Sequence, residues 1–257
     1  MLVGRIDDWF RNRTDNLIHD LVSVENLGLY GRGATTMIAR TIFNGKWKFP
    51  FSEIMTTLED FFLPKDSTRK VHMMKDYSRD TVLITHLDDA IAVKIPYSDT
   101  DGGWFIAIMP QEPAEKQDLI SLLHNTDLES LWDSFVPKDC FSLNMPKFST
   151  TTDLVLDDGT GQQISRIEAL KDFASGVDLS NMFHRTKIGN MVYRLHTTIT
   201  NDEEGSRVEA TFVGDDYDGG PAKNSIRVHL NKPFAYIITN AEHYIRSMGI
   251  FSGGEDE

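Results

Sequence analysis

The chain is almost devoid of cysteine, since Cys140 is the only one among its 257 residues. A single cysteine excludes an intrachain disulfide framework, and it is compatible with a reducing compartment without requiring one. Because Cys140 precedes the alternating apolar segment 141–145, we expect a buried structural thiol. A nucleophilic role would need a neighbouring base, and the sequence offers no clear one.

Long apolar runs are also missing. No stretch of 18 or more apolar residues occurs, so we predict no transmembrane helix and no membrane partner. Residues 1–6 lack the apolar run of a signal peptide. The protein would be extracellular if the true N-terminus carries a signal peptide, and cytoplasmic otherwise. Asn12 begins the only glycosylation sequon, in a helical pattern that favours chance occurrence.

Positive charge is scarce relative to negative charge. Lysine and arginine number 26 against 39 aspartates and glutamates, which gives a net charge of -13 and a pI of about 5.0. We therefore expect no nucleic acid or other polyanion as a partner. The hydrophobic content of 40% is ordinary for a globular protein, and the chain is long enough to bury a substantial core.

Motifs of metal binding and catalysis are missing as well. The eight histidines show neither HxxxH nor paired Cys/His spacing. The acidic segment 215–220 lacks ligands at the fifth position and at the end of a calcium loop. There is no Gly-x-Ser-x-Gly elbow and no phosphate-binding glycine loop. We therefore expect no metal, no cofactor and no enzymatic activity.

Apolar periodicity predicts a mixed α/β (α+β) protein whose second half is dominated by strands. Helical spacing predicts helices over 6–21, 128–135 and 164–173. Alternation and apolar runs predict strands over 35–43, 91–95, 104–109, 141–145, 191–199, 226–230, 234–239 and 244–250.

Two local patterns make these predictions more specific. In 91–95, β-branched residues alternate with Ala92 and Lys94, as expected of a half-buried strand, and a turn cluster then leads into 104–109 to make a hairpin. The segment 126–129 has the form of a capping box, which places the start of the helix 128–135 at Thr126.

Three segments closely resemble signatures of the serpin family. Residues 43–51 read FNGKWKFPF, residues 231–234 read NKPF, and residues 202–206 read DEEGS, where serpins carry the hinge of the reactive loop. Their shared order and near-family spacing are more specific than any one match. Further similar segments, within a resemblance that covers about residues 5–250, lie at 71–75, 94–97, 108–110, 143–148 and 177–182.

The resemblance implies a multi-sheet serpin-like fold in one domain, 1–257, that lacks the N-terminal third of the family pattern. The missing part is expected either because the chain is a fragment or incomplete gene model, or because it is a genuine smaller serpin. We expect a monomer once that part is supplied. Residues 203–232 would hold the hinge and reactive-centre loop, and 252–257 a loose tail.

The resemblance also implies roles for individual residues. Lys147 would pair with Glu203 at the top of the strand from which the loop springs, and Trp47 would lie at the breach, where the loop first enters the main sheet. The hinge itself would comprise Glu203, Glu204, Gly205, Ser206, Arg207, Val208, Glu209 and Ala210.

A serpin inhibits a serine protease as a suicide substrate, so the implied partner is such a protease, and the trap works by insertion of the cleaved loop into the main sheet. The reactive bond stays open between two places. Counting forward from Gly205 gives Gly219-Gly220, and counting back from Pro233 gives Ala222-Lys223.

The hinge composition keeps an alternative function open. Inserted residues must bury every second side chain in the sheet, which favours small residues. Here Val208 is bulkier than usual and Phe212 is large. A non-inhibitory or non-functional serpin-like binding protein, whose loop is cleaved as a plain substrate, is therefore the second hypothesis.

Overall fold

The computed structural model describes Arg5, Asp8 and residues 35–41, 45–77, 81–98, 102–156, 191–205 and 226–254. The chain divides into two compact units, Met1–Arg40 with Thr152–Thr197 and Thr41–Thr151 with Thr198–Glu257. The prediction of a single domain over 1–257 stays a prediction. The predicted helices 6–21 and 164–173 lie outside the described residues, apart from Arg5 and Asp8, and so does the tail 255–257.

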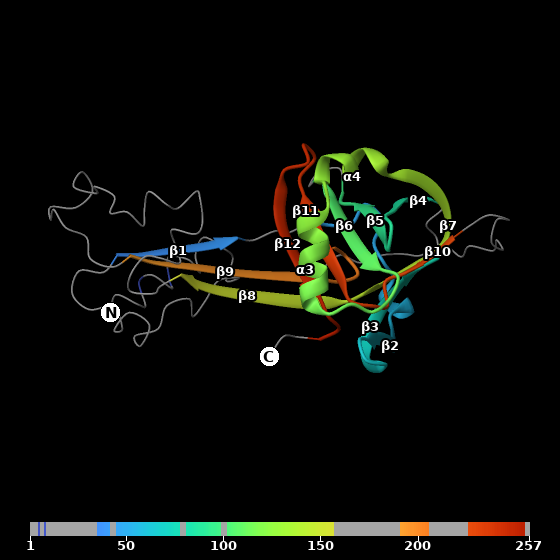
Figure 1. Cartoon of the computed structure of the whole chain (residues 1–257), viewed down its shortest axis with the longest axis horizontal. Coiled ribbons are helices and arrows are strands. Elements are labelled where there is room, and N and C mark those ends of the chain that lie inside the picture. The colour runs from blue at the N-terminus through green and yellow to red at the C-terminus, as the bar shows by residue number, and fades with distance from the viewer. Residues whose placement is uncertain are drawn as a thin grey trace. The chain divides into compact units, whose positions relative to one another are not determined.

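Three strands make the smaller sheet. Strands β1 (Thr35–Thr41), β9 (Met191–Asn201) and β8 (Phe148–Leu156) pair in the order β1–β9–β8 (Figure 1). The predicted strands 35–43 and 191–199 are thereby confirmed. Strand β9 leads directly into the segment 202–205, where the predicted hinge starts.

The larger sheet has nine strands, in the order β12–β11–β6–β5–β4–β7–β3–β2, with β10 paired to β7. Their bounds are β2 (Thr57–Leu63), β3 (Ser67–Asp76), β4 (Thr81–His86), β5 (Ala90–Pro96), β6 (Trp104–Pro110), β7 (Val136–Pro146), β10 (Ile226–His229), β11 (Phe234–Thr239) and β12 (Ile245–Phe251). Antiparallel pairing of β5 with β6 confirms the predicted hairpin.

Strand β7 joins two parts of this sheet because its two halves have different partners. Its first residues pair antiparallel with β4, from Val136 to Asp139, whereas its last residues pair antiparallel with β3, from Leu143 to Pro146. Strand β10 also pairs with the second half of β7 and runs parallel to it. The long β7 ribbon and its neighbours are visible in Figure 1.

Aromatic side chains from separate strands fill the core between β8 and the larger sheet. The ring centroid of Phe148 lies 4.8 Å from Phe251, 5.5 Å from Tyr236 and 6.0 Å from Phe234. Offset and edge contacts of this kind add to the free energy gained from burying apolar area. Phe148 is 5% exposed, so truncating it would open a cavity among three strands.

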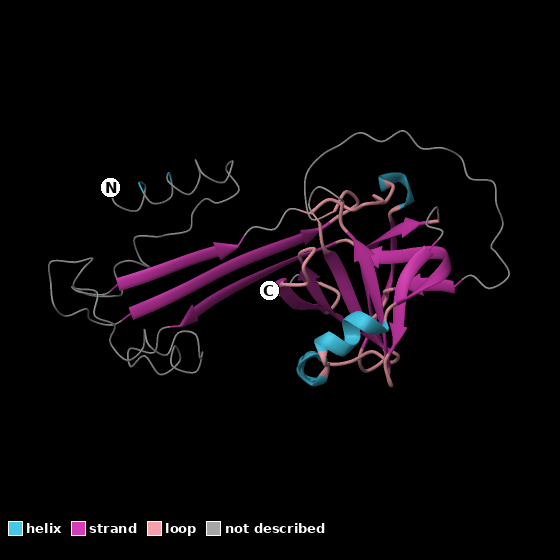
Figure 2. Ribbon diagram, turned by 90° about the horizontal axis from the view of Figure 1, so that it is seen from above, coloured by secondary structure: helices cyan, strands magenta, loops and turns pink. Residues whose placement is uncertain are grey.

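Two α-helices and one 3-10 helix are described. Helix α3 (Lys116–Asn125), which the sequence did not predict, packs against β11 and β12, and helix α4 (Leu128–Ser134) follows it (Figure 2). The short helix η1 spans Glu53–Met55. The predicted cap of α4 at Thr126 is wrong, because Asp127 is the N-cap and its side chain accepts a hydrogen bond from the Glu129 amide.

The prediction that 91–95 is a half-buried strand is also wrong. Ala92 and Lys94 are 0% and 8% exposed, so β5 is buried on both faces. The reason is that Ala92 belongs to an apolar cluster with Leu131 of α4, and Trp132 packs against that cluster. The alternating pattern of residues 91–95 therefore belongs to a strand that is packed on both faces, not to one with a solvent-exposed face.

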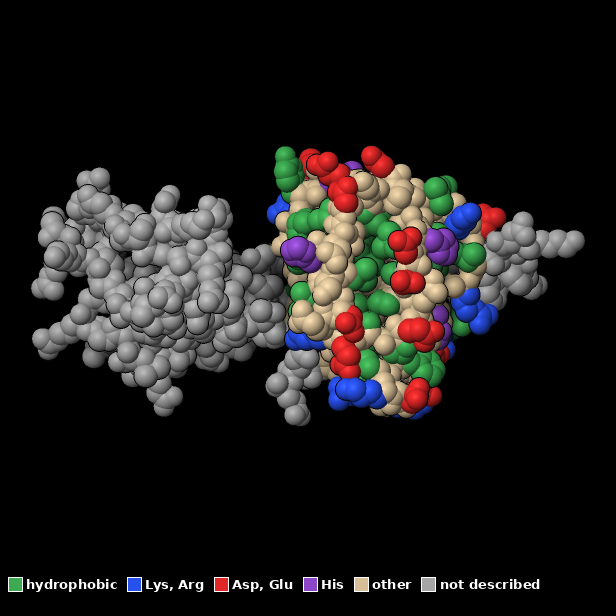
Figure 3. All heavy atoms as spheres, in the orientation of Figure 1, with side chains coloured by type: hydrophobic (Ala, Val, Ile, Leu, Met, Phe, Trp, Pro, Cys, Tyr) green, Lys and Arg blue, Asp and Glu red, His purple; other side chains and the backbone are tan. Residues whose placement is uncertain are grey.

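The mixed α/β, multi-sheet class is confirmed by this architecture. Figure 3 shows acidic side chains spread over several elements of the visible face, with basic side chains mainly near its margins. Cys140 lies in β7, but its side chain is outside the described part of the chain, so a buried thiol stays a prediction.

We expect Phe148→Ala to lower the free energy of unfolding by about 3–5 kcal/mol, because it deletes a buried ring and leaves a cavity. Urea unfolding at pH 7 measures this. Phe62→Ala is the matched control, since Phe62 is 42% exposed on the edge strand β2 and its removal should change stability by only about 0.5 kcal/mol. Equal losses in both variants would contradict the described core.

Candidate functional site

A tight turn at the end of β9 is the centre of the site. The Asp202 amide donates to the Gly205 carbonyl oxygen at 2.9 Å. The Asp202 carboxylate accepts from the amides of Glu204 at 3.1 Å and Gly205 at 3.3 Å. The side chain of Asp202 therefore closes the turn that its own backbone begins.

Glycine is required at the end of this turn. Gly205 has φ of +144°, a conformation that other residues rarely adopt. A Cβ atom there would lie 2.2 Å from the Gly45 carbonyl oxygen and 2.6 Å from the Lys46 Cα. The backbone of 45–46 thus approaches the turn more closely than any side chain would permit.

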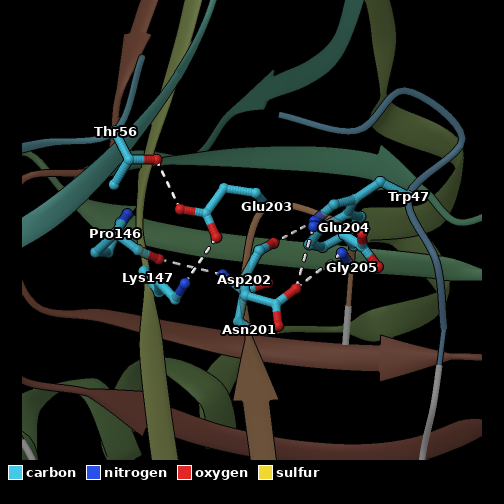
Figure 4. Close-up of polar contacts among 9 residues, drawn as sticks. All are labelled: Trp47, Thr56, Pro146, Lys147, Asn201, Asp202, Glu203, Glu204 and Gly205. Atoms are coloured by element: carbon cyan, nitrogen blue, oxygen red, sulfur yellow. Dashed lines mark hydrogen bonds and ion pairs between the residues drawn. The ribbon is translucent and has the colours of Figure 1, made fainter. Parts of the chain in front are cut away.

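The segment 45–51 holds the turn through three hydrogen bonds. The Trp47 amide donates to the Glu204 carbonyl oxygen at 2.8 Å (Figure 4). The Phe51 amide donates to the Glu203 carbonyl oxygen at 2.8 Å. The Trp47 indole Nε1 donates to the Asp202 carbonyl oxygen at 2.9 Å. Three successive carbonyl groups of the turn are thereby satisfied without water.

The Trp47 ring is fixed by its aromatic neighbours. It is 2% exposed and stacks on Tyr97 with centroids 4.8 Å apart and planes 4° apart. The Phe105 ring meets it edge-on at 5.7 Å. Because the ring cannot turn without losing these contacts, its Nε1 is held in position to donate to the turn.

Glu203 carries the charge of the site. Its side chain is 7% exposed and accepts two hydrogen bonds, from Lys147 Nζ at 2.8 Å and from Thr56 Oγ1 at 2.7 Å (Figure 4). Lys147 is itself positioned by its amide, which donates to the His72 carbonyl oxygen at 2.7 Å. Glu203 therefore links the turn to β3, to the residue after η1 and to the end of β7.

These contacts set the protonation of both partners. Burial raises the pKa of Glu203, but hydrogen bonds from Lys147 and Thr56 outweigh it and hold the pKa below its ordinary 4.5. The hydrogen bond with Glu203 raises the pKa of Lys147 above 10.5, although burial opposes it. Both groups are therefore charged at neutral pH. Burial raises the pKa of Asp202, partly offset by the two amides that it accepts from.

The other end of the predicted loop is also attached to the larger sheet. Strand β10 begins at Ile226 and pairs in parallel with β7. Just beyond it, the Leu230 amide donates to the Asn144 carbonyl oxygen at 2.9 Å, and the Phe62 amide donates to the Asn231 carbonyl oxygen at 2.8 Å. Residues on both sides of 206–225 are thus held by hydrogen bonds to β strands or to 45–51.

The structure brings together five of the predicted site residues, Trp47, Lys147, Glu203, Glu204 and Gly205. The other predicted site residues lie outside the described part of the chain: Ser206, Arg207, Val208, Glu209, Ala210, Gly219, Gly220, Ala222 and Lys223. Their roles stay predictions.

Sequence reasoning missed three contributors to the site. Thr56 gave no signal, because it meets Glu203 across a separation of 147 residues. Asn201 is 1% exposed and donates to the Pro146 carbonyl oxygen at 3.1 Å, which a buried polar residue at a strand end could have suggested. Tyr97 was noticed only as part of a matching segment, not as the stacking partner of Trp47.

Within the described ranges, no helix is long and apolar enough to cross a membrane. The same part of the chain contains no group of three or more His, Cys, Asp or Glu side chains arranged to hold a metal ion. The arrangement at 201–205 is thus an anchored turn held by hydrogen bonds and one ion pair.

Comparison with known proteins gives consistent matches. A family model described as serpin (serine protease inhibitor) matches residues 3–252. Serpin A3-8 of Bos taurus is 28% identical over 241 residues, which cover 91% of this chain and 53% of that protein. Antitrypsin of Bombyx mori is 26% identical over 254 residues, which cover 96% of this chain and 61% of that protein.

The fold is similar to solved structures. Serpin48 of the insect Tenebrio molitor superposes with a TM-score of 0.72 at 19% identity, covering 96% of this chain and 63% of that one. At this identity the match shows the fold alone, and it confirms the predicted serpin-like fold. The chain spans about half the length of the curated relatives that it matches.

We expect Lys147→Met to lower the free energy of unfolding by about 1–2 kcal/mol, because it leaves the buried Glu203 carboxylate with Thr56 alone, while screening of the half-exposed ammonium limits the loss. A double-mutant cycle with Glu203→Gln in urea measures the coupling. Lys65→Met is the control, since the Lys65–Glu115 pair is exposed on both sides and should contribute little. Additive effects of Lys147→Met and Glu203→Gln would exclude a direct interaction.

The ion pair should also leave a signature in acid. Because the pKa of Glu203 is lower in the folded protein than in the unfolded chain, its stabilisation is present above pH 4.5 and is lost as the pH falls below 4.5. The raised pKa of Asp202 acts in the opposite sense and partly offsets this loss. Urea midpoints between pH 7 and pH 3 should fall less in Glu203→Gln than in the unmodified protein. An unchanged slope would contradict the assignment.

Proposed function

Since this chain belongs to the serpin family, we propose that it inhibits a serine endopeptidase as a suicide substrate, with residues 206–225 as the reactive-centre loop. One observation carries the proposal. The segment 206–225 is preceded by the turn 202–205, which is hydrogen-bonded to 45–51, and it is followed by β10, which is paired to β7. A protease that recognises a substrate in extended form needs such a segment offered between fixed ends.

The chemistry belongs to the protease. Its serine Oγ attacks the carbonyl carbon of the loop bond, the C–N bond breaks, and the new amine leaves with a proton. The acyl ester that remains is normally released by water. A trap results when the cleaved loop inserts as a new strand before water attacks, and the protease is distorted. Insertion would start at the end of β9, because Ser206 follows Gly205 directly in the sequence.

The anchored turn 202–205 supports this role because it would stay in place while the loop 206–225 moves. Glu203 and Trp47 hold the last residues before the loop, so an inserting strand would begin at a fixed point at the end of β9. If that point were loose, the start of insertion would vary, and the ester would be hydrolysed more often. Asp202 and Gly205 would fix the start of the predicted hinge for as long as their contact survives cleavage.

The composition of the loop supports a second candidate. Val208 and Phe212 are larger than residues that enter a sheet interior easily. Slow insertion would let water release the protease, and the protein would then act as a substrate or as a non-inhibitory binding protein. The two functions differ in whether the protease remains active.

Incubation with trypsin-like, elastase-like and chymotrypsin-like proteases, followed by denaturing gels, tests the proposal. We expect a band at the summed mass that survives boiling, together with loss of protease activity. Clean cleavage within 206–225 with a fully active protease would establish the second candidate instead.

A variant of the loop locates the reactive bond. Because trypsin-like proteases cut after a basic residue, Lys223→Ala should abolish a complex with such a protease if the cut follows Lys223. A bond at Ala222-Lys223 would place Ala222 before the cut and suit an elastase-like protease, and a bond at Gly219-Gly220 would leave any complex unchanged by this substitution. Lys65→Ala is the matched control, because it removes an exposed lysine that lies outside the hinge and away from both candidate bonds.

A further inference from the structure

Lys94 is a lysine in an unusual place, on β5 in the interior of the nine-stranded sheet. It is only 8% exposed. Its Nζ lies 4.1 Å from the centroid of Trp132, 4.3 Å from Trp104 and 5.4 Å from Phe135. Three aromatic rings therefore surround one amine.

The fold builds this cage from three elements. Lys94 pairs with Ile106 across the β5–β6 ladder, so Trp104 is its diagonal neighbour on the same face. Trp132 lies in the last turn of α4 and Phe135 is the C-cap of that helix, and both rings lie near Lys94 Nζ. His243 stacks on the Trp132 ring, with centroids 4.0 Å apart and planes 7° apart.

The position of His243 is itself imposed by the backbone. His243 has φ of 68° in the turn between β11 and β12, and the Tyr244 amide donates to the Asn240 side chain at 2.8 Å. A non-glycine residue in this conformation stores strain that the surrounding structure must offset. The turn thereby keeps the His243 ring against Trp132.

Charge around the amine is low. Within the part of the chain that the structure describes, no hydrogen bond or ion pair reaches Lys94 Nζ, and Asp133 is the charged group that acts on it. Burial lowers the pKa of Lys94 to about 8, and the charge of Asp133 offsets this only in part. His243 faces the cage from the far side of Trp132.

The three ring faces attract the charged amine and offset part of the cost of burying it. An apolar side chain of similar length would avoid that cost altogether, so stability alone does not favour lysine at this position. What the site provides instead is a partly neutral amine bounded by three aromatic rings. Desolvation of this kind is how lysines are activated as nucleophiles toward carbonyl groups.

We propose that Lys94 is a carbonyl-reactive lysine that condenses with small apolar aldehydes, forming a Schiff base between the rings of Trp104, Trp132 and Phe135. The lone pair of the neutral amine attacks the aldehyde carbon, and a C–N bond forms. The carbonyl oxygen leaves as water with both amine hydrogens, which gives a C=N bond. Nothing is oxidised or reduced, and water reverses the reaction.

Two features favour aldehydes over acylating agents. The Schiff base can be protonated, and the ring faces then still hold a cation, whereas an amide would lose that interaction. Because Lys94 is only 8% exposed, we also expect small aldehydes to react with it faster than bulky reagents. With its pKa near 8, the neutral amine fraction at pH 7 is about 300 times that of a lysine at 10.5.

Trapping of the Schiff base tests the proposal. The full chain is treated at pH 7 with limiting propanal and cyanoborohydride, and peptide mass spectrometry measures the alkylation rate at each lysine. We expect Lys94 to react at least about tenfold faster than Lys138, an exposed lysine on β7, and its rate to level off above about pH 8. Equal or slower reaction at Lys94 would overturn the proposal.

Variants separate the cage from the amine. Trp132→Leu admits water and should remove the excess reactivity, while Trp132→Phe keeps a ring and should retain part of it; circular dichroism confirms that each variant is folded. Lys94→Met should lose the label at this peptide and unfold at the same or a higher temperature. Excess reactivity that survives Trp132→Leu in a folded protein would contradict the role of the rings.

Discussion

Burial of the Glu203 carboxylate is the constraint on which the anchored turn depends. A carboxylate that is 7% exposed must be paired, and here Lys147 and Thr56 supply the two donors. Satisfying it fixes the end of β7 and the residue after η1 against the end of β9. The turn 202–205 is consequently held by three separate segments of the chain rather than by its own backbone alone.

Hydrogen bonds between Trp47 and the turn 202–205 add to the anchoring by the Glu203 ion pair. Trp47 can donate both its amide and its indole nitrogen to the turn only because Gly205 lets the two backbones approach closely. Tyr97 and Phe105 then hold the Trp47 ring in the one orientation that reaches Asp202. Replacing Gly205, or removing the rings that pack on Trp47, would therefore weaken the same hydrogen bonds.

The sequence predicted individual site residues better than it predicted the contacts between elements that are distant in the chain. The matching segments indicated Trp47, Lys147 and Glu203, and strand patterns located most of β1, β5, β6, β9 and β11. Alternation failed at Lys94, because helix α4 covers the second face of β5, which no local pattern reveals. Thr56 and the helix α3 were missed for the same reason: their places depend on contacts distant in sequence.

Amide hydrogen exchange at Trp47 and Phe51 tests most directly whether the turn is a rigid anchor. Both amides donate to carbonyl groups of 203–204. The account predicts that they exchange as slowly as amides in the centre of β11, that is, only when the larger sheet unfolds. Exchange at the rate of exposed loop amides would show that the turn opens freely and would contradict the account.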